Sequence, residues 1–192
     1  MSQNIEIEFK NLLTETEFTL LKNYLNIDDS CFVKQVNHYI DTEHFALKEK
    51  GCALRIREKN GDYELTLKQP HSIGLLETNQ KLSHDEAKGL LENRCLIDGP
   101  VKNCLNQLHI SIEELSYFGS LTTERAETKF EGGLVVLDFS TYLNQFDYEV
   151  EYEVNDYQLG KEIFAKLLSD LNIPIRQTEN KVRRFYNAKK RQ

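Results

Sequence analysis

Two segments of the chain place carboxylates at every second position. Glu6 and Glu8 stand near the amino terminus, and Glu149, Glu151 and Glu153 alternate with tyrosine and valine further on. In a β-strand, residues i and i+2 point to the same face, so each segment presents its carboxylates together. Carboxylate oxygens are hard ligands that suit Mg²⁺ or Mn²⁺. The two acidic segments therefore indicate a divalent metal site.

Basic residues follow the same alternation in other segments. Lys10 continues the first strand, Arg55 and Arg57 share a face of Ala53–Arg57, and Lys68 and Arg125 lie in later strands. Guanidinium groups offer forked donors to phosphate oxygens, and ammonium groups offer point charges. Acidic residues for a metal and basic residues for phosphates together indicate a site for a metal-bound polyphosphate. A solvated face with cross-strand ion pairs is the alternative, and spacing alone leaves it open.

About eight strands joined by hairpins and short helices must position these residues, which favours an antiparallel sheet. Residue pairs Asn60-Gly61 and Gly132-Gly133 indicate turns, and Thr14 with Glu17 and Ser83 with Glu86 indicate helix starts. The expected strands are 5–10, 33–42, 53–57, 62–69, 75–82, 121–130, 134–142 and 148–154. A helix is expected over 158–172, followed by Pro174 and a basic tail over 181–191.

Closing this sheet into a barrel would bring the charged faces into one lumen. An eight-stranded barrel is wide enough for side chains or one small ligand. So many buried charges are tolerated only if they are paired, hydrated or neutralised by a ligand. The residues expected on this face are Glu6, Glu8, Lys10, Arg55, Arg57, Lys68, Glu77, Arg125, Asp138, Glu149 and Glu151. The amphipathic helices would cover the apolar faces from outside.

Length and composition limit the remaining possibilities. The chain has 192 residues, which suits one domain over 1–192, with a helical insertion at about 84–113 between strands. A net charge of −7 argues against a general binder of the nucleic-acid backbone. No apolar run is long enough for a membrane span, and the amino terminus does not read as a signal peptide. The four cysteines show no metal-binding spacing, so reduced thiols and a cytoplasmic location are expected.

The sequence resembles the CYTH family, the triphosphate tunnel metalloenzymes, and most closely its small stand-alone bacterial members. Glu6–Lys10 matches the family's ExExK signature. Segments 38–42, 53–57 and 65–68 are similar to the strands that follow it, and Asp138 with 148–151 is similar to its acidic carboxy-terminal strands. The resemblance covers nearly the whole chain. It implies an α+β fold, an eight-stranded antiparallel closed β-barrel (the triphosphate tunnel) with helices packed outside.

The resemblance also implies a role for each matching residue. It implies metal ligands at Glu6, Glu8, Asp138, Glu149 and Glu151. It implies phosphate contacts from Lys10, Arg55, Arg57, Lys68, Arg125 and Lys181, and a catalytic set of Glu6, Glu8, Lys10 and Arg57. Glu77 and Glu153 fit the inward face, and each could equally be a structural ion-pair partner. Arg183 and Arg184 could equally be solvated charges of the tail.

The expected function is metal-dependent hydrolysis of inorganic triphosphate or a small organic triphosphate, with Mg²⁺ or Mn²⁺ as cofactor and the triphosphate as the small-molecule partner. One alternative is a CYTH-type adenylate cyclase that makes cyclic AMP from ATP in the same pocket. Another is a non-catalytic module that binds a polyphosphate or nucleotide. The choice of triphosphate, the preferred metal and the oligomeric state stay open.

Overall fold

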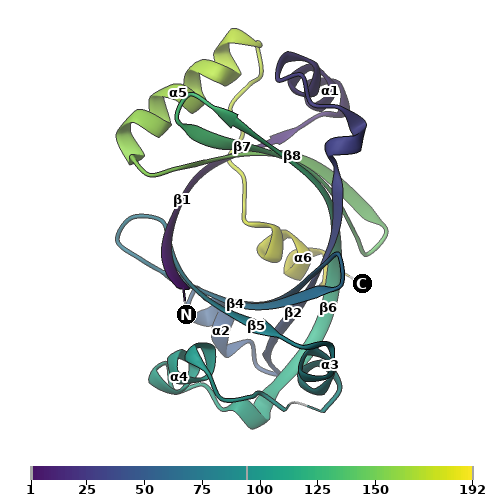
Figure 1. Cartoon of the computed structure of the whole chain (residues 1–192), viewed down its shortest axis with the longest axis vertical. Coiled ribbons are helices and arrows are strands. Elements are labelled where there is room, and N and C mark those ends of the chain that lie inside the picture. Colours follow the sequence, from purple (N-terminus) through teal and green to yellow (C-terminus); the bar gives the residue numbers. More distant parts are fainter. Residues whose placement is uncertain (1, 94, 192) are drawn as a thin grey trace. The chain divides into compact units, whose positions relative to one another are not determined.

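The fold is taken from a computed structural model that describes residues 2–93 and 95–191 (Figure 1). These residues form eight strands, six α-helices and two short 3₁₀ helices. The strands are β1 (Ser2–Leu13), β2 (Val33–Thr42), β3 (Ala53–Lys59), β4 (Asp62–Pro70), β5 (Leu75–Leu82), β6 (Leu115–Phe130), β7 (Gly133–Tyr142) and β8 (Gln145–Val154). The helices are α1 (Glu15–Tyr24), α2 (Ala46–Glu49), α3 (His84–Asn93), α4 (Pro100–Gln107), α5 (Tyr157–Asp170) and α6 (Lys181–Lys189).

The described strands form a closed antiparallel barrel in the order β1-β5-β4-β3-β2-β6-β7-β8. This confirms the predicted fold class, an α+β chain built on an eight-stranded barrel. The register of β7 and β8 sets Asp138 opposite Glu149, and that of β6 and β7 sets Arg125 opposite Asp138. Across β1 and β8, Lys10 lies opposite Glu151. Because cross-strand partners share a face, these charged residues lie on one side of their strands.

Two compact units can be distinguished along the chain. The first unit comprises Met1–Ile5 and Gln35–Leu121, and the second unit comprises Glu6–Lys34 and Thr122–Gln192. Each has a hydrophobic core of its own.

In the second unit, α1 and α5 cover the apolar faces of the strands beside them (Figure 1). Val150 and Tyr152 of β8 are buried against Leu21 of α1 and Phe164 of α5. The rings of Tyr152 and Phe164 stack with centroids 6.4 Å apart and an interplanar angle of 8°. The predicted capping box opens α1, since Thr14 and Glu17 each accept a hydrogen bond from the other's backbone amide. Covering this face leaves the opposite, polar face for β8's glutamates.

In the first unit, α3 and α4 lie beside β4 and β5 and pack on the apolar side of the sheet. Leu54, Ile56, Leu65 and Leu67 alternate along β3 and β4 and are at most 1 % exposed. These two helices and the following 3₁₀ turn occupy the stretch predicted as a helical insertion. Asp41 orders the start of α2, because its carboxylate accepts hydrogen bonds from the backbone amides of Thr42, Leu47 and Lys48.

Several element bounds differ from the sequence-based expectation, and one helix was not expected. Strand β6 begins at Leu115, six residues before the predicted start, and α5 ends at Asp170. The larger difference is at the carboxy terminus, where the basic tail contains helix α6. Phe185 and Tyr186 are buried on one side of that helix, and Phe185 packs 6.0 Å from the ring of Tyr142. Burial of these two aromatic residues stabilises a helix that its charged sequence did not suggest.

Two helical glycines provide a test of this packing. A Cβ at Gly160 of α5 would lie 2.6 Å from Cγ2 of Val154 and 3.0 Å from the ring of Phe9, whereas a Cβ at Gly89 of α3 would meet only Cys95, at 3.9 Å. We expect Gly160→Ala to lower the free energy of unfolding by about 1–3 kcal/mol, because the methyl group overpacks the contact between α5 and β8.

The matched variant Gly89→Ala is expected to raise the free energy of unfolding by up to about 1 kcal/mol, because alanine favours a helix where space allows. Urea unfolding followed by circular dichroism measures both. Equal stability changes in the two variants would contradict the close approach of α5 to β8.

Candidate active site

Three buried carboxylates form the centre of the second unit. Asp138 comes from β7 and Glu149 and Glu151 from β8, and their exposed fractions are 0 %, 0 % and 5 %. One oxygen of each lies within 4.8 Å of the others. Strand alternation puts both glutamates on one face of β8, and the register with β7 brings Asp138 beside them. Three of the five predicted metal ligands are therefore brought together.

Arg125 of β6 binds two of these carboxylates. Its Nε donates to Oδ1 of Asp138 at 2.8 Å and one terminal nitrogen donates to Oδ2 at 2.6 Å, a bidentate pair. The same terminal nitrogen donates to Oε2 of Glu151 at 2.8 Å. Planar forked donors match carboxylate geometry, so Arg125 fixes the orientation of both side chains. Glu153 lies at the edge of this arrangement, 3.9 Å from Arg125.

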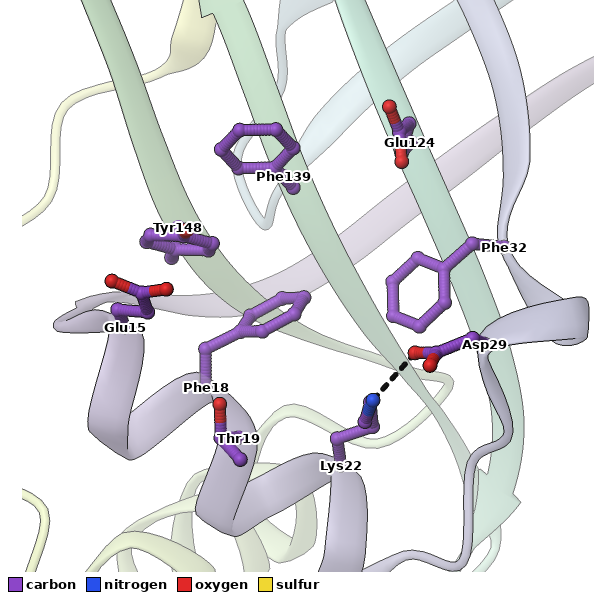
Figure 2. A pocket seen from close by; sticks show the side chains of 9 residues that line it. All are labelled: Glu15, Phe18, Thr19, Lys22, Asp29, Phe32, Glu124, Phe139 and Tyr148. Atoms are coloured by element: carbon purple, nitrogen blue, oxygen red, sulfur yellow. Dashed lines mark hydrogen bonds and ion pairs between the residues drawn. The ribbon is translucent and has the colours of Figure 1, made fainter.

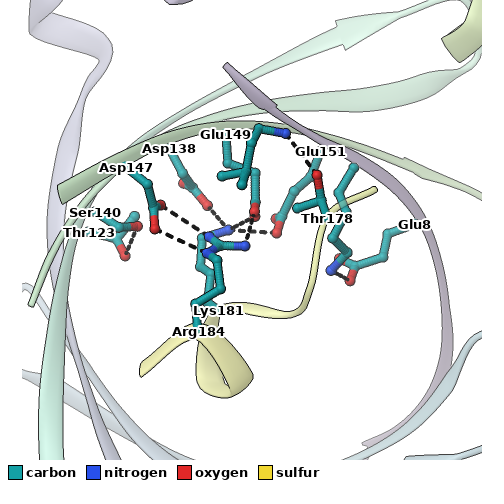
Figure 3. A network of polar contacts seen from close by, with 12 residues as sticks. Glu8, Thr123, Asp138, Ser140, Asp147, Glu149, Glu151, Thr178, Lys181 and Arg184 are labelled. Atoms are coloured by element: carbon teal, nitrogen blue, oxygen red, sulfur yellow. Dashed lines mark hydrogen bonds and ion pairs between the residues drawn. The ribbon is translucent and has the colours of Figure 1, made fainter. Parts of the chain in front are cut away.

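Helix α6 adds two further cations (Figure 3). The Nζ of Lys181 lies 2.8 Å from Oδ2 of Asp138 and 2.7 Å from Oε1 of Glu151, and it also contacts Oε1 of Glu149. Arg184 donates to Oε2 of Glu149 at 2.6 Å and to both oxygens of Asp147 at 3.0 and 3.1 Å. Every carboxylate of the cluster thus contacts at least one cation.

A strap of irregular chain before α6 (Ile173–Asn180) runs along the end of β1. The side chain of Asn11 donates to the carbonyl of Pro174 at 3.1 Å and accepts from the amide of Arg176 at 2.6 Å. Thr178 accepts from the amide of Leu12 at 2.9 Å. Arg176 also forms a bidentate pair with Glu17 of α1, with both contacts at 2.8 Å. These contacts determine where α6 begins.

Burial and charge set the protonation of the cluster. Burial alone would lower the pKa of Lys181, but attraction to Asp138, Glu149 and Glu151 raises it well above its ordinary value. Burial opposes ionisation of Glu151, yet Lys181 and Arg125 hold its pKa well below the usual range. For Glu149, burial prevails and raises the pKa to about 7, although Lys181 opposes it. The raised pKa of Glu149 therefore lies close to neutral pH.

The other predicted residues of this unit lie near the cluster. Lys10 and Glu8 form an ion pair on β1. Burial lowers the pKa of Lys10, but attraction to Glu8 and to Glu151 outweighs it, so the pKa is raised. Glu6 interacts electrostatically with Glu153, whose pKa it helps to raise. The amino-terminal ExExK segment and the acidic strand β8 are thus electrostatically coupled.

The predicted residues Arg55, Arg57, Lys68 and Glu77 belong to the first unit. Lys68 pairs with Glu77 across β4 and β5 at 2.6 Å, so Glu77 does have the ion-pair contact that the sequence left open. Nε of Arg57 donates to Asn37 at 3.5 Å. Nε of Arg55 is buried and has no hydrogen-bond partner within the described part of the chain. The phosphate-binding roles of Arg55, Arg57 and Lys68 stay predictions.

The sequence interpretation missed Asp147 and left Arg184 open between the site and the solvated tail. Asp147 lies two residues before Glu149, so its place on the same face of β8 could have been read from alternation. Arg184 lies one helical turn after Lys181, but this relation holds only once the tail is known to be helical. Arg184 is 11 % exposed, whereas its neighbour Arg183 is 68 % exposed and pairs with Glu179. Of the two arginines, only Arg183 behaves as a solvated tail charge.

The donor set of the cluster fits a hard divalent cation. Asp138, Glu149 and Glu151 offer three carboxylates, and within residues 2–93 and 95–191 no cysteine or histidine joins this group. Oxygen-only sets of this kind suit Mg²⁺, Mn²⁺ or Ca²⁺. The cluster therefore has the composition of a metal site.

The second unit also has a hollow of about 220 Å³ beside α1 (Figure 2). Four aromatic rings line it, together with three carboxylates, one threonine and Lys22. Lys22 pairs with Asp29 at 2.5 Å, so the lining offers little positive charge to a polyphosphate. The lining residues are Glu15, Phe18, Thr19, Lys22, Asp29, Phe32, Glu124, Phe139 and Tyr148. The acidic cluster, with its three cations, is the stronger candidate for a functional site.

The fold is a closed eight-stranded antiparallel barrel, and comparison places the chain within a family. The family model described as "CYTH domain" matches residues 4–186. The chain belongs to the CYTH domain family, as the ExExK segment and the ordered strands indicated. The match spans both compact units.

Individual relatives agree with this assignment. The chain is 51 % identical over 191 residues to "Putative triphosphatase YjbK" of Bacillus subtilis (strain 168), covering 100 % of this chain and 99 % of that protein. It is 44 % identical to a crystal structure from Bacillus halodurans described as a "putative adenylate cyclase (bh2851)", with a TM-score of 0.94 and coverage of 97 % and 100 %. The Hippeastrum protein HpAC1, at 23 % identity and a TM-score of 0.78 over 95 % and 96 % of the chains, shares the fold.

Among the described residues, no helix combines the length and apolar character that crossing a bilayer requires.

Glu153 gives the site a measurable pH dependence. Burial raises its pKa to about 7 against the attraction of Arg125, and Glu6 adds to the rise. The pKa of Glu153 is higher in the folded state than the unfolded value of about 4.5. The contribution of this carboxyl to the free energy of unfolding is therefore complete below about pH 4.5 and is lost as the pH rises through about 7. We expect Glu153→Gln to leave stability unchanged at pH 4.5 and to raise the free energy of unfolding by about 1–2 kcal/mol at pH 8, after discounting for solvent screening.

Urea unfolding of the metal-free protein in a chelator, at both pH values, measures this difference. The exposed Glu162 of α5 supplies the matched control, and Glu162→Gln should show no pH-dependent difference from the parent chain. A Glu153→Gln variant whose stability follows the parent's at both pH values would contradict the raised pKa.

Proposed function

We propose that this protein is a metal-dependent triphosphatase that hydrolyses inorganic triphosphate or a small organic triphosphate. The observation that supports this proposal most strongly is the buried cluster of Asp138, Glu149 and Glu151. Arg125 and Lys181 bind this cluster, and the chain belongs to the CYTH family. A site with both carboxylates and cations suits a ligand that is itself a cation bound to a polyanion. The name of the Bacillus subtilis relative supports hydrolysis of a triphosphate.

The acidic residues would hold Mg²⁺ or Mn²⁺. We assign Glu6, Glu8, Asp138, Glu149 and Glu151 as its protein ligands, with the last three supported by their convergence. When bound, such an ion supplies Lewis-acid polarisation of phosphate oxygens and offsets their charge. Arg125 and Arg184 would keep the carboxylates oriented, since each donates to oxygens of the cluster.

The basic residues would hold the phosphate chain and stabilise charge that develops on it. Arg125, Lys10 and Lys181 carry their charge within the second unit, where attraction to the acidic residues keeps all three protonated. Preorganised cations in a site with little water stabilise charge that shifts to phosphoryl and leaving-group oxygens. We propose that Arg55, Arg57 and Lys68 also bind phosphate oxygens, supported by the family match of β3 and β4.

A second candidate function is adenylate cyclisation. The description of the Bacillus halodurans relative, 44 % identical to this chain, is the observation that favours it. In that reaction the ribose 3′-hydroxyl attacks the α-phosphorus of ATP, so the products are cyclic AMP and pyrophosphate. Hydrolysis of ATP or tripolyphosphate releases orthophosphate instead. Product identity therefore separates the two reactions.

The location proposed for the protein is the cytoplasm. All four cysteines are free thiols, two of them buried, as expected for a reducing compartment.

The activity test uses tripolyphosphate, ATP and thiamine triphosphate with Mg²⁺ or Mn²⁺, and measures phosphate release and cyclic AMP separately. We expect phosphate release from at least one of the three, no cyclic AMP, and no reaction in a chelator. Glu8→Ala and Arg57→Ala should each lower the turnover by about 10²-fold or more while the fold survives, because each removes a charge assigned to the reacting complex.

Matched variants at exposed positions, Glu162→Ala and Arg183→Ala, should keep the parent's rate. Circular dichroism confirms that every variant folds. Cyclic AMP as the main product would favour the cyclase, and tight binding of all three compounds without products would favour the non-catalytic module. Undiminished turnover in both Glu8→Ala and Arg57→Ala would remove those residues from the mechanism.

A further inference from the structure

Lys181 lies where the three carboxylates converge. Its Nζ contacts one oxygen of each: Oδ2 of Asp138 at 2.8 Å, Oε1 of Glu151 at 2.7 Å, and Oε1 of Glu149. The Nζ of Lys181 donates hydrogen bonds to Glu149 and Glu151 and forms an ion pair with Asp138, so one ammonium contacts every carboxylate of the cluster. The side chain is only 12 % exposed and is held there by α6 (Figure 3).

The two arginines take the remaining oxygens. Arg125 binds Oδ1 of Asp138 and Oε2 of Glu151, while Arg184 binds Oε2 of Glu149. Glu149 and Glu151 each turn one oxygen toward an arginine and the other toward Lys181, whereas Oδ2 of Asp138 contacts both Arg125 and Lys181. The arginines orient the carboxylates, and Nζ of Lys181 lies between the three of them.

The oxygens that contact Nζ of Lys181 are also those that a single ion would use. Two ligands of one Mg²⁺ lie at most about 4.2 Å apart. One oxygen of each of the three carboxylates lies within 4.8 Å of the others, and all three carboxylates contact the same Nζ. An ion among them would need the volume that Nζ of Lys181 occupies. It would also face the ammonium at a separation where like charges repel strongly in a buried site. The ammonium and the ion cannot share the cluster.

We propose that Lys181 is a resident counter-ion of the metal-free site, and that a divalent cation enters the Asp138–Glu149–Glu151 cluster only by displacing the Lys181 side chain. The identity of the displacing ion rests on the proposed function. The strap would stay in place during the exchange, because its contacts to Asn11, Leu12 and Glu17 do not involve the cluster. Displacement therefore requires movement of the Lys181 side chain and the first turn of α6. The displaced ammonium becomes available to an anion that arrives with the metal.

The first test is calorimetric titration with Mn²⁺ alone, in the absence of any phosphate compound. We expect Lys181→Met to bind Mn²⁺ at least about tenfold more tightly than the parent chain, because the competing ammonium is gone; tenfold corresponds to about 1.4 kcal/mol. Arg183→Gln removes the same charge from an exposed position of α6 and should change the affinity by less than about twofold. Unchanged or weaker Mn²⁺ binding by Lys181→Met would overturn the proposal.

The second test uses the parent chain and does not depend on whether Lys181→Met folds. Limited acylation of amines, mapped by mass spectrometry, reports how accessible Lys181 is, with the exposed Lys189 of the same helix as internal reference. Saturating Mg²⁺ should raise labelling of Lys181 relative to Lys189 at least about threefold, since the ammonium leaves its three carboxylate partners. An unchanged or lower ratio would overturn the proposal.

These outcomes separate this inference from the proposed function. If Lys181→Met binds Mn²⁺ more tightly while the parent chain releases no phosphate from tripolyphosphate, the counter-ion role of Lys181 is supported and the triphosphatase activity is contradicted. If the parent chain releases phosphate but Lys181→Met leaves the Mn²⁺ affinity unchanged, the triphosphatase activity is supported and the counter-ion role is contradicted.

Discussion

The burial of three carboxylates at one place in the second unit is the constraint on which the rest of that unit depends. Asp138, Glu149 and Glu151 are almost entirely removed from water, and isolated buried charges of this kind are very costly. Their neutralisation requires cations that are themselves buried and well aligned. Arg125 supplies one from a neighbouring strand, and Lys181 and Arg184 supply two from the carboxy-terminal helix.

This requirement explains the path of the carboxy-terminal segment. Helix α6 is short and charged, and a helix of this length is only marginally stable without tertiary contacts. The strap ties it to β1 and α1 through Asn11 and Arg176, while Phe185 and Tyr186 are buried on its other side. The polar contacts fix the direction of the segment, and the aromatic residues stabilise its docking. Both are needed to bring Lys181 and Arg184 to the carboxylates.

The same strands also build the hydrophobic core, and this links the site to the stability of the barrel. Along β8, Val150 and Tyr152 pack under α1 and α5 while Glu149 and Glu151 face the other way. A shift of register by one residue would exchange the two sets, so that the core would receive the glutamates. The hydrophobic contacts that fix register therefore also fix the site. The hydrogen bonds from Tyr152 to the carbonyls of Phe130 and Glu131 help to fix this register.

The sequence by itself determined which residues share a face, because strand alternation is a local property with a period of two. On that basis Glu6 and Glu8, and Glu149 with Glu151, could be grouped. The number of strands and hairpins predicted an antiparallel sheet, and the family resemblance implied its closure into a barrel. The tertiary structure alone decided which groups meet. The contact of Lys181 with Glu149 joins residues 32 positions apart, and that of Arg184 with Asp147 joins residues 37 positions apart. Such contacts depend on cross-strand register and on the path of the strap, and local periodicity contains neither. For this reason the sequence left Arg184 open between the site and the solvated tail, although in the folded chain it joins Lys181 in neutralising the acidic cluster.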